Sequence, residues 1–145
     1  MYDNTRKREH MKNFNEKRIL LADDVASIRE ALKACLLNLG FKSITIAIDG
    51  RDAWEKLKNL AKEGTPAEII FSDINMPNCH GIDLVKLIRN SDDYKETPVI
   101  MISTENETEI IMDAIEAGAN NYILKPFNPA TIKEKLNEIA RKENL

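Results

Sequence analysis

Side chains suited to phosphoryl and metal chemistry occur at one recurring place in this sequence. Each directly follows a short apolar run: Asp23 and Asp24 after 18–22, Asp73 after 67–72, Ser103 after 98–102, and Lys125 after 122–124. If these runs are parallel strands of one sheet, their carboxyl ends lie along the edge where such sheets bind ligands. The sequence therefore predicts that three carboxylates, a hydroxyl and an amine converge at that edge.

Taken singly, these residues have simpler interpretations. An Asp or Ser after a strand is commonly the N-cap of the next helix, and Lys125 alone would be a solvated surface charge. As a set they are harder to explain, because carboxylates about 5 Å apart repel by roughly 3 kcal/mol per pair at an effective dielectric near 20. Bound Mg²⁺ compensates such repulsion, usually through one or two carboxylates together with waters and phosphate oxygens.

The chemistry that fits this set is phosphoryl transfer to a carboxylate. Asp73 is the natural nucleophile, since Asp side chains form aspartyl-phosphate intermediates. The remaining work is positioning and charge stabilisation. Lys125 suits one phosphoryl oxygen as a compact point charge, and we expect Ser103 to donate a hydrogen bond to another.

The elements that must position these residues alternate between two periodicities. Strand patterns occupy 18–22, 43–48, 67–72, 98–102 and 122–124, and helical patterns occupy 28–39, 53–61, 84–88, 110–115 and 132–140. Gly40, Gly64 and Gly118 follow three of the helical patterns as expected stops. Alternation of this kind predicts an α/β fold with a mostly parallel sheet covered on both faces.

Length and composition set the limits for this interpretation. At 145 residues, with 43% hydrophobic and 31% charged residues, the chain is sized and composed as one globular domain. We expect no signal peptide, and no apolar run is long enough to cross a bilayer. Two cysteines give no disulfide framework, which favours the cytoplasm. The net charge of −3 gives no reason to expect nucleic acid as a partner. We expect a monomer with a flexible extension at 1–16 and a domain at 17–145.

Four segments carry a resemblance to a known family. They are LLADD at 20–24, SDINMPNCHGIDLVKLIR at 72–89, VIMIST at 99–104 and AGANNYILKPF at 117–127. Together they closely resemble the receiver domains of bacterial two-component response regulators, and in particular single-domain chemotaxis regulators of the CheY type. The resemblance covers about 17–142. It implies a flavodoxin-like, doubly wound sheet of five parallel strands in the order 2-1-3-4-5, with five helices.

The resemblance also implies roles for the residues at the strand ends. Asp73 is similar to the phosphoacceptor that receives its phosphoryl group from a CheA-like sensor histidine kinase. Asp24, Asp73 and the backbone carbonyl of Asn75 match direct Mg²⁺ ligands, whereas Asp23 matches a ligand that acts through water. Lys125 matches a lysine whose bond to the following proline is cis.

A second group of residues matches positions that regulate the signal. Ser103 matches the switch hydroxyl, and Tyr122 matches the aromatic whose rotamer reports the switch. Asn75 and Glu105 match positions that set the rate of self-dephosphorylation, which implies a short-lived phosphoryl group. His80 and Cys79 depart from the usual Asp and Met. A surface residue and a small hydrophobe are their simplest interpretations.

The expected output is a change in protein binding. Only 20 residues follow Lys125, so we expect no further output domain, and phosphorylation would shift the population of surface conformations. Ile111, Tyr122 and Lys135 match the face that binds the flagellar motor switch protein, although Glu107 and Thr108 replace two lysines beside it. A motor switch protein or another output protein, and a phosphatase, are the expected partners.

Two other functions stay open. The chain could be a phosphorelay intermediate or phosphate sink between histidine phosphotransfer proteins. It could also be a hydrolase with an aspartyl-phosphate intermediate, but such enzymes carry an Asp-x-Asp signature where this chain has Asp73-Ile74-Asn75. We therefore expect a signalling domain whose catalysis is limited to its own phosphorylation and dephosphorylation.

Overall fold

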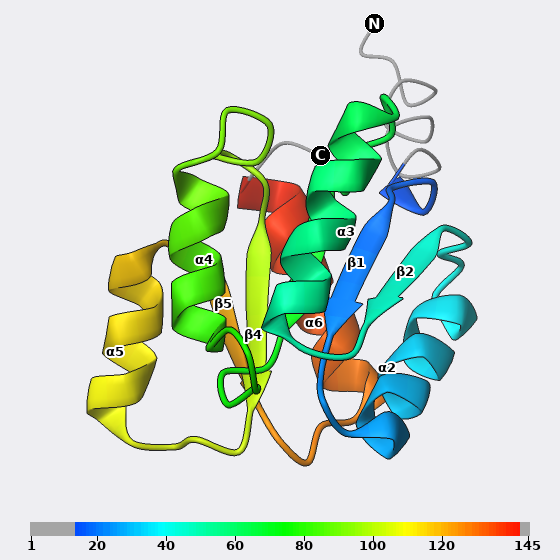
Figure 1. Cartoon of the computed structure of the whole chain (residues 1–145). Helices are drawn as coiled ribbons and strands as arrows, with labels where there is room; N and C mark the ends of the chain where they lie inside the picture. Colours follow the sequence, from blue (N-terminus) through cyan, green and yellow to red (C-terminus); the bar gives the residue numbers. More distant parts are fainter. Residues whose placement is uncertain (1–13, 143–145) are drawn as a thin grey trace, which may run out of the picture.

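A five-stranded parallel sheet with helices on both faces forms the protein (Figure 1). The computed structural model describes residues 14–142. Its strands are β1 Ile19–Ala22, β2 Ile44–Ala47, β3 Ile69–Ser72, β4 Val99–Ser103 and β5 Asn121–Leu124. Its helices are α2 Ala26–Asn38, α3 Gly50–Lys62, α4 Gly81–Arg89, α5 Thr108–Ala117 and α6 Pro129–Lys142. The strand order β2-β1-β3-β4-β5 confirms the predicted fold.

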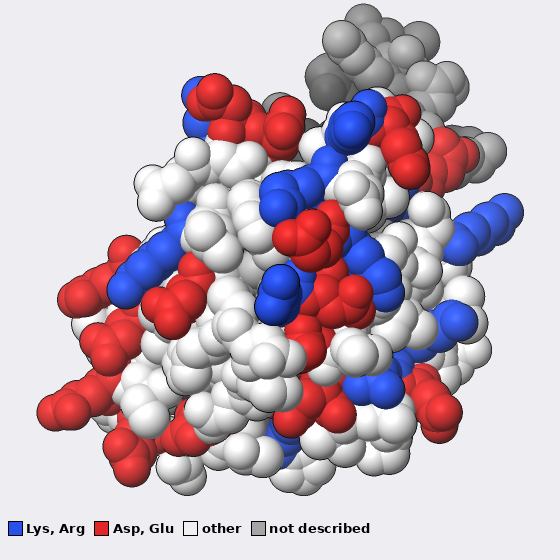
Figure 2. Space-filling view, in the orientation of Figure 1, with Lys and Arg blue, Asp and Glu red and all other residues white. Residues whose placement is uncertain are grey.

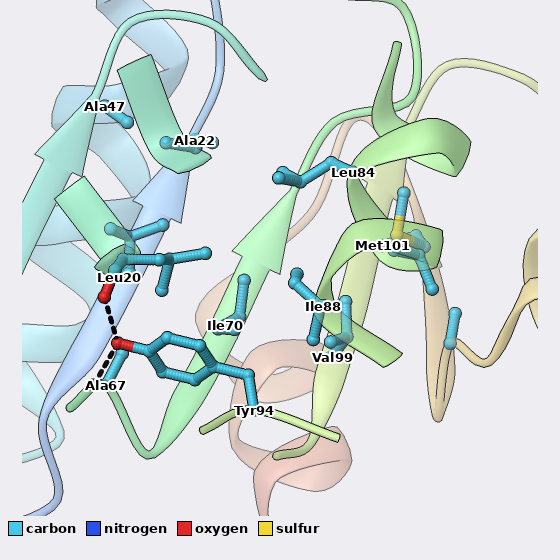
Figure 3. Packing of buried hydrophobic residues seen from close by; sticks show 14 of the residues in the cluster. Leu20, Ala22, Ala47, Ala67, Ile70, Leu84, Ile88, Tyr94, Val99 and Met101 are labelled. Atoms are coloured by element: carbon cyan, nitrogen blue, oxygen red, sulfur yellow. Dashed lines mark hydrogen bonds between the residues drawn. The ribbon is translucent and has the colours of Figure 1, made fainter. Parts of the chain in front are cut away.

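The sheet separates two hydrophobic clusters, one on each face, because successive side chains of a strand point to opposite faces. In β1, Leu20 packs with α3, α4 and α5, and Leu21 packs with α2 and α6. Figure 3 shows the first cluster, in which Leu84 and Ile88 of α4 approach the sheet. Burial on both faces explains why the central strands read as continuous apolar runs rather than as alternating ones.

The glycines that follow three of the helices adopt a left-handed backbone conformation. Gly40, just beyond α2, has φ 100°, and Gly118, at the end of α5, has φ 122°. Residues with a Cβ rarely adopt this conformation, whereas glycine does so readily. Gly64, just beyond α3, likewise has a positive φ of 82°, so all three predicted helix stops are confirmed.

The beginning of the described chain packs onto the domain. The Phe14 and Phe41 rings meet edge to face, with centroids 5.6 Å apart. Phe14 thereby joins the cluster beneath α2 and α6, although the sequence had placed it in the extension. Residues 1–13 of that predicted extension lie outside the described residues. Within 14–142, no helix combines the length and apolarity needed to cross a membrane.

Candidate functional site at the carboxyl edge of the sheet

Buried polar side chains gather at one edge of the sheet. Those of the described residues are Asp23, Asp49, Ser72, Asp73 and Ser103. Each lies at the last position of a strand or within two residues beyond it. Burying a charge is costly unless a partner compensates it. Buried polar groups at this edge that are not needed for packing the core indicate a functional site.

Three carboxylates lie together at the centre of this edge. Asp23, Asp24 and Asp73 each offer an oxygen, and these oxygens lie within 4.8 Å of one another. Asp23 and Asp73 are buried, whereas Asp24 is exposed. A set of oxygen donors that is open on one side fits Mg²⁺, which keeps several waters and prefers hard ligands. The predicted convergence of these acids is thus present in the fold.

Lys125 joins two of the three acids. Its ammonium donates hydrogen bonds to Asp23 Oδ2 at 2.6 Å and to Asp73 Oδ2 at 2.9 Å. Burial lowers the pKa of Lys125, but the two carboxylates outweigh it and the pKa is raised. For Asp23, burial raises the pKa, and the opposing effect of Lys125 does not cancel it. The Lys125–Pro126 peptide bond is cis, as the resemblance implied.

Main-chain groups fix the orientation of the two buried acids. Asp23 Oδ1 accepts a hydrogen bond from the Val25 N–H at 2.9 Å. Asp73 Oδ1 accepts one from the Ile74 N–H at 2.7 Å. Gly81 closes the loop after Asp73, because a Cβ there would lie 2.0 Å from the Asp73 carbonyl oxygen. Only glycine permits this approach, and it keeps the loop against the end of β3.

Glu105 connects the loop after Asp73 to β5. Its Oε1 accepts a hydrogen bond from Asn75 Nδ2 at 2.5 Å, and its main-chain carbonyl accepts one from the Tyr122 hydroxyl at 2.8 Å. Its N–H donates to the hydroxyl of the fully buried Ser103 at 3.3 Å. Burial raises the pKa of Tyr122, a bond with Ser103 opposes this, and the nearby Glu105 and Asp73 charges raise it further. The four residues singled out as modulators therefore form one hydrogen-bonded group.

The predicted output residues lie on three different elements. Ile111 lies on α5, Tyr122 on β5 and Lys135 on α6, and all three are partly exposed. Lys135 Nζ lies 3.6 Å from Glu138 Oε2. Acidic side chains gather over α5 in Figure 2, where the exposed acids are Glu107, Glu109, Asp113 and Glu116. A partner of this side of the domain meets a negative surface.

The two departures from the family pattern in the loop before α4 have structural explanations. His80 is exposed and forms the N-cap of α4, where its Nδ1 accepts a hydrogen bond from the Ile82 N–H at 3.3 Å. Cys79 is half-buried. Burial raises the pKa of its thiol, and the charges of Asp83 and Asp49 raise it further. A thiol with a raised pKa carries little thiolate, so Cys79 is poorly suited to redox sensing.

One acid of the polar edge escaped the sequence analysis. Asp49 follows the strand pattern at 43–48 just as Asp73 follows 67–72, so the same reasoning applied to the second strand would have found it. Asp49 is buried, and its Oδ2 accepts a hydrogen bond from Asn78 Nδ2 at 2.8 Å. Asn78 belongs to the loop after Asp73, and nothing in its residue type signalled this contact.

The fold and the site together define a flavodoxin-like α/β domain whose acidic site lies where the strand order reverses, between β1 and β3. The family described as response regulator receiver domain matches residues 19–137. The chain belongs to this family, and its receiver domain is of the type found in CheY chemotaxis proteins.

Several relatives support this assignment. The chain is 42% identical to the chemotaxis protein CheY-3 of Vibrio cholerae over 131 residues, which cover 90% of this chain and 96% of that protein. It is 41% identical to the chemotaxis protein CheY1 of Helicobacter pylori over 119 residues, or 82% and 93% of the two chains.

Solved structures agree with the sequence comparison. The fold is similar to that of the response regulator CheY4 of Vibrio cholerae, with a TM-score of 0.76, 33% identity and coverage of 86% of this chain and 98% of that chain. It is also similar to a chain in the CheX–CheY–BeF3–Mg²⁺ complex of Borrelia burgdorferi, with a TM-score of 0.78, 29% identity and coverage of 85% and 88%.

Proposed function

We propose that Asp73 accepts a phosphoryl group from a phosphohistidine of a CheA-like sensor kinase in a Mg²⁺-dependent reaction. The phosphorylated domain then signals in the cytoplasm through switched protein binding, in the control of the flagellar motor. The observation that carries this proposal is the meeting of Asp73 with Asp23, Asp24 and Lys125 at one edge of the sheet. Membership of the CheY-type receivers supports the chemotaxis role.

The transfer is a displacement at phosphorus. A carboxylate oxygen of Asp73 attacks, the phosphorus–nitrogen bond of the phosphohistidine breaks, and its electron pair stays on the imidazole nitrogen. Asp73 suits this role because it is held by the Ile74 N–H on one oxygen and by Lys125 on the other. Such positioning supplies much of the catalysis in phosphoryl transfer.

The neighbouring residues divide the remaining work. Asp24, Asp73 and the Asn75 carbonyl would hold Mg²⁺ directly and Asp23 through water. When bound, the ion neutralises charge on the phosphoryl oxygens. Lys125 transfers part of its hydrogen bonding from the carboxylates to a phosphoryl oxygen, and the Ser103 hydroxyl donates a hydrogen bond to another. Asn75 and Glu105 border the site and set how long the phosphoryl group lasts.

The signal leaves through the hydrogen-bonded group around Glu105. If Ser103 turns toward the phosphoryl group, its bonds with the Glu105 N–H and with Tyr122 change. Tyr122 then shifts the population of conformations of the surface formed by α5, β5 and α6. A motor switch protein or another output protein binds this surface. The Borrelia relative was solved with a second protein, CheX, which supports proposing protein partners here, a phosphatase among them.

The direct test is phosphorylation with acetyl phosphate, with Mg²⁺ and with a chelator. We expect one acid-stable, hydroxylamine-labile phosphoryl group on the wild type with Mg²⁺ and none on Asp73→Ala. Asp83→Ala, which removes an exposed acid of α4, serves as the matched control and should react normally. Incorporation by Asp73→Ala at the wild-type rate would refute the assignment, and turnover of p-nitrophenyl phosphate would favour the hydrolase.

A further inference from the structure

Asp49 is a buried acid of the polar edge that the proposed reaction does not use. It directly precedes α3 and is 8% exposed. Its Oδ1 accepts a hydrogen bond from the Asp52 N–H at 2.7 Å and thereby caps the helix. This bond lowers the pKa of Asp49 despite the opposing effect of burial, and the contact with Asn78 lowers it further. The side chain is therefore a carboxylate at neutral pH.

The second oxygen of Asp49 does something that a helix cap does not require. Oδ2 accepts the hydrogen bond from Asn78 Nδ2 at 2.8 Å. Asn78 lies in the loop 74–80, with a left-handed φ of 68°. Because β1 lies between β2 and β3, this bond reaches across the end of the strand that leads into Asp23 and Asp24. A serine would cap α3 about as well, but its shorter side chain has no second oxygen for Asn78.

The main chains of the two loops also meet at this point. A Cβ on Gly50 would lie 2.0 Å from the Cys79 carbonyl oxygen, so the first residue of α3 packs directly on the loop after β3. At its end, the loop 74–80 is fixed by the bond from the Gly81 N–H to the Ile74 carbonyl at 2.7 Å. Asn75, whose carbonyl is the expected metal ligand, lies between Asp73 and the contact made by Asn78.

We propose that Asp49 is a positioning residue for the phosphorylation site, which acts through Asn78. By holding the loop 74–80 against the start of α3, it fixes the Asn75 carbonyl relative to the carboxylates of Asp73 and Asp24. This inference rests on the proposed function. Residues that orient metal ligands without touching the metal typically change metal affinity or activity by about 10- to 100-fold when they are replaced.

The experiment uses the full chain with two single variants and their double variant. Asp49→Ser keeps a cap for α3 and removes the oxygen that reaches Asn78. Asn78→Gly removes the amide, and glycine readily adopts the φ of 68° found there. For each we would measure the Mg²⁺ dissociation constant by calorimetry, the rate of phosphorylation by acetyl phosphate at limiting Mg²⁺, and the melting temperature with a chelator.

Both single variants should weaken Mg²⁺ binding about tenfold and slow phosphorylation at limiting Mg²⁺ similarly. The double variant should be no worse than either single one, because both changes remove the same contact. Asp49→Asn should stay close to the wild type, since the Asn78 amide can turn and accept a hydrogen bond from the new amide. Melting temperatures should fall no further for Asp49→Ser than for a conservative change in the same helical turn.

Asp52→Asn is that matched control. It removes one charge from the same turn, at a side chain that contacts Ile48 and Lys56. It should leave Mg²⁺ affinity unchanged. Unaltered affinity in Asp49→Ser and Asn78→Gly, or additive losses in the double variant, would overturn the proposal. If Asp49→Ser does not fold, Asn78→Gly alone decides. A wild type that binds Mg²⁺ but takes up no phosphoryl group would refute the proposed function, while the affinities still test Asp49.

Discussion

Lys125 and Asp23, 102 residues apart in the sequence, form a buried ion pair at 2.6 Å. The same ammonium also reaches Asp73. The oxygens that Lys125 engages thus belong to the acids expected to surround Mg²⁺. Binding of the ion and the ion pair therefore compete for the same carboxylates, and the predictions below begin from this competition.

Replacing Lys125 should weaken the fold and strengthen metal binding. In Lys125→Met, three clustered carboxylates lose their buried cation, which should lower the free energy of unfolding by about 3 kcal/mol without Mg²⁺. Mg²⁺ then binds without competition, so its stabilising effect should exceed that in the wild type. Denaturant titrations with Mg²⁺ and with a chelator measure both. Lys135→Met, which breaks a partly exposed pair with Glu138, should cost less than about 1 kcal/mol. An equal Mg²⁺ effect in Lys125→Met and wild type would contradict the competition.

Asp23→Asn should stabilise the metal-free protein, and the gain should depend on pH. The pKa of Asp23 in the folded state lies above the unfolded value of 3.8, so between these two values the folded state binds more protons. The contribution of Asp23 to stability therefore falls as pH rises through this interval and stays unfavourable at neutral pH. We expect Asp23→Asn to gain about 0.5–2 kcal/mol at neutral pH.

This gain should shrink as the pH falls toward 3.8, where wild-type Asp23 is itself protonated in the folded state. Urea titrations with a chelator, from neutral to acidic pH, provide the measurement. Asp83→Asn, at an exposed position, serves as the control for removing one negative charge. A gain that grows in acid would mean that the pKa of Asp23 is depressed rather than raised.

Tyr122→Phe should separate phosphorylation from output. The substitution removes only the hydroxyl, which bonds the Glu105 carbonyl at 2.8 Å and Ser103, and it leaves the side chains of Asp73, Lys125 and Ser103 in place. Phosphorylation by acetyl phosphate should proceed as in the wild type, whereas the increase in partner binding that follows phosphorylation should be lost. Fluorescence anisotropy of a labelled motor-switch peptide reports the second quantity. A variant that keeps the full increase would show that this hydroxyl does not carry the signal.

Charge on α5 should select the partner. Glu107 is exposed and Thr108 opens the helix, and both lie at positions where the family resemblance implies lysines. Phosphorylated protein should bind a motor-switch peptide of its own system, and bind poorly to one evolved for a lysine-bearing face. Rim charges act mainly on association rate and partner choice, so the discrimination should fade at high salt.

Glu107→Lys combined with Thr108→Lys should recover binding to the second peptide. Glu30→Lys combined with Ala34→Lys, at exposed positions of α2, is a control with the same change in net charge. Titrations before and after phosphorylation at two salt concentrations give the comparison. If phosphorylation strengthens neither interaction, the phosphorelay function becomes the better explanation.

The order of elements and the polar edge could be predicted from sequence because both follow from repetition. Apolar runs that end on Asp23, Asp73 and Ser103 place those residues at one edge of any parallel sheet. The strand order came from family resemblance, since periodicity alone does not fix which strands are neighbours. The start of one strand differs from the prediction. Ala67 was expected in a strand but lies before β3, because its N–H donates a hydrogen bond to the Tyr94 hydroxyl rather than to a neighbouring strand.

Contacts between loops were beyond the sequence. The bond from Asn75 to Glu105 and the bond from Asn78 to Asp49 depend on backbone angles within short loops, among them the φ of 68° at Asn78. Neither residue type nor spacing specifies these angles. The bridging of two acids by Lys125 likewise depends on the conformation of a long side chain, which strand ends locate only approximately.

The alternation of side chains along the sheet has a mechanical consequence. Tyr122 packs against the helices on one face, and its neighbour Ile123 is buried against those on the other. Met101 and Ile102 are divided between the faces in the same way on the adjoining strand. The helices on the two faces thus pack against neighbouring residues of the same strands, which are only a few residues long. A small shift of β5 would displace side chains in both layers. A change at Tyr122 should therefore alter the NMR signals of isotope-labelled methyl groups on α6 as well as those on α5.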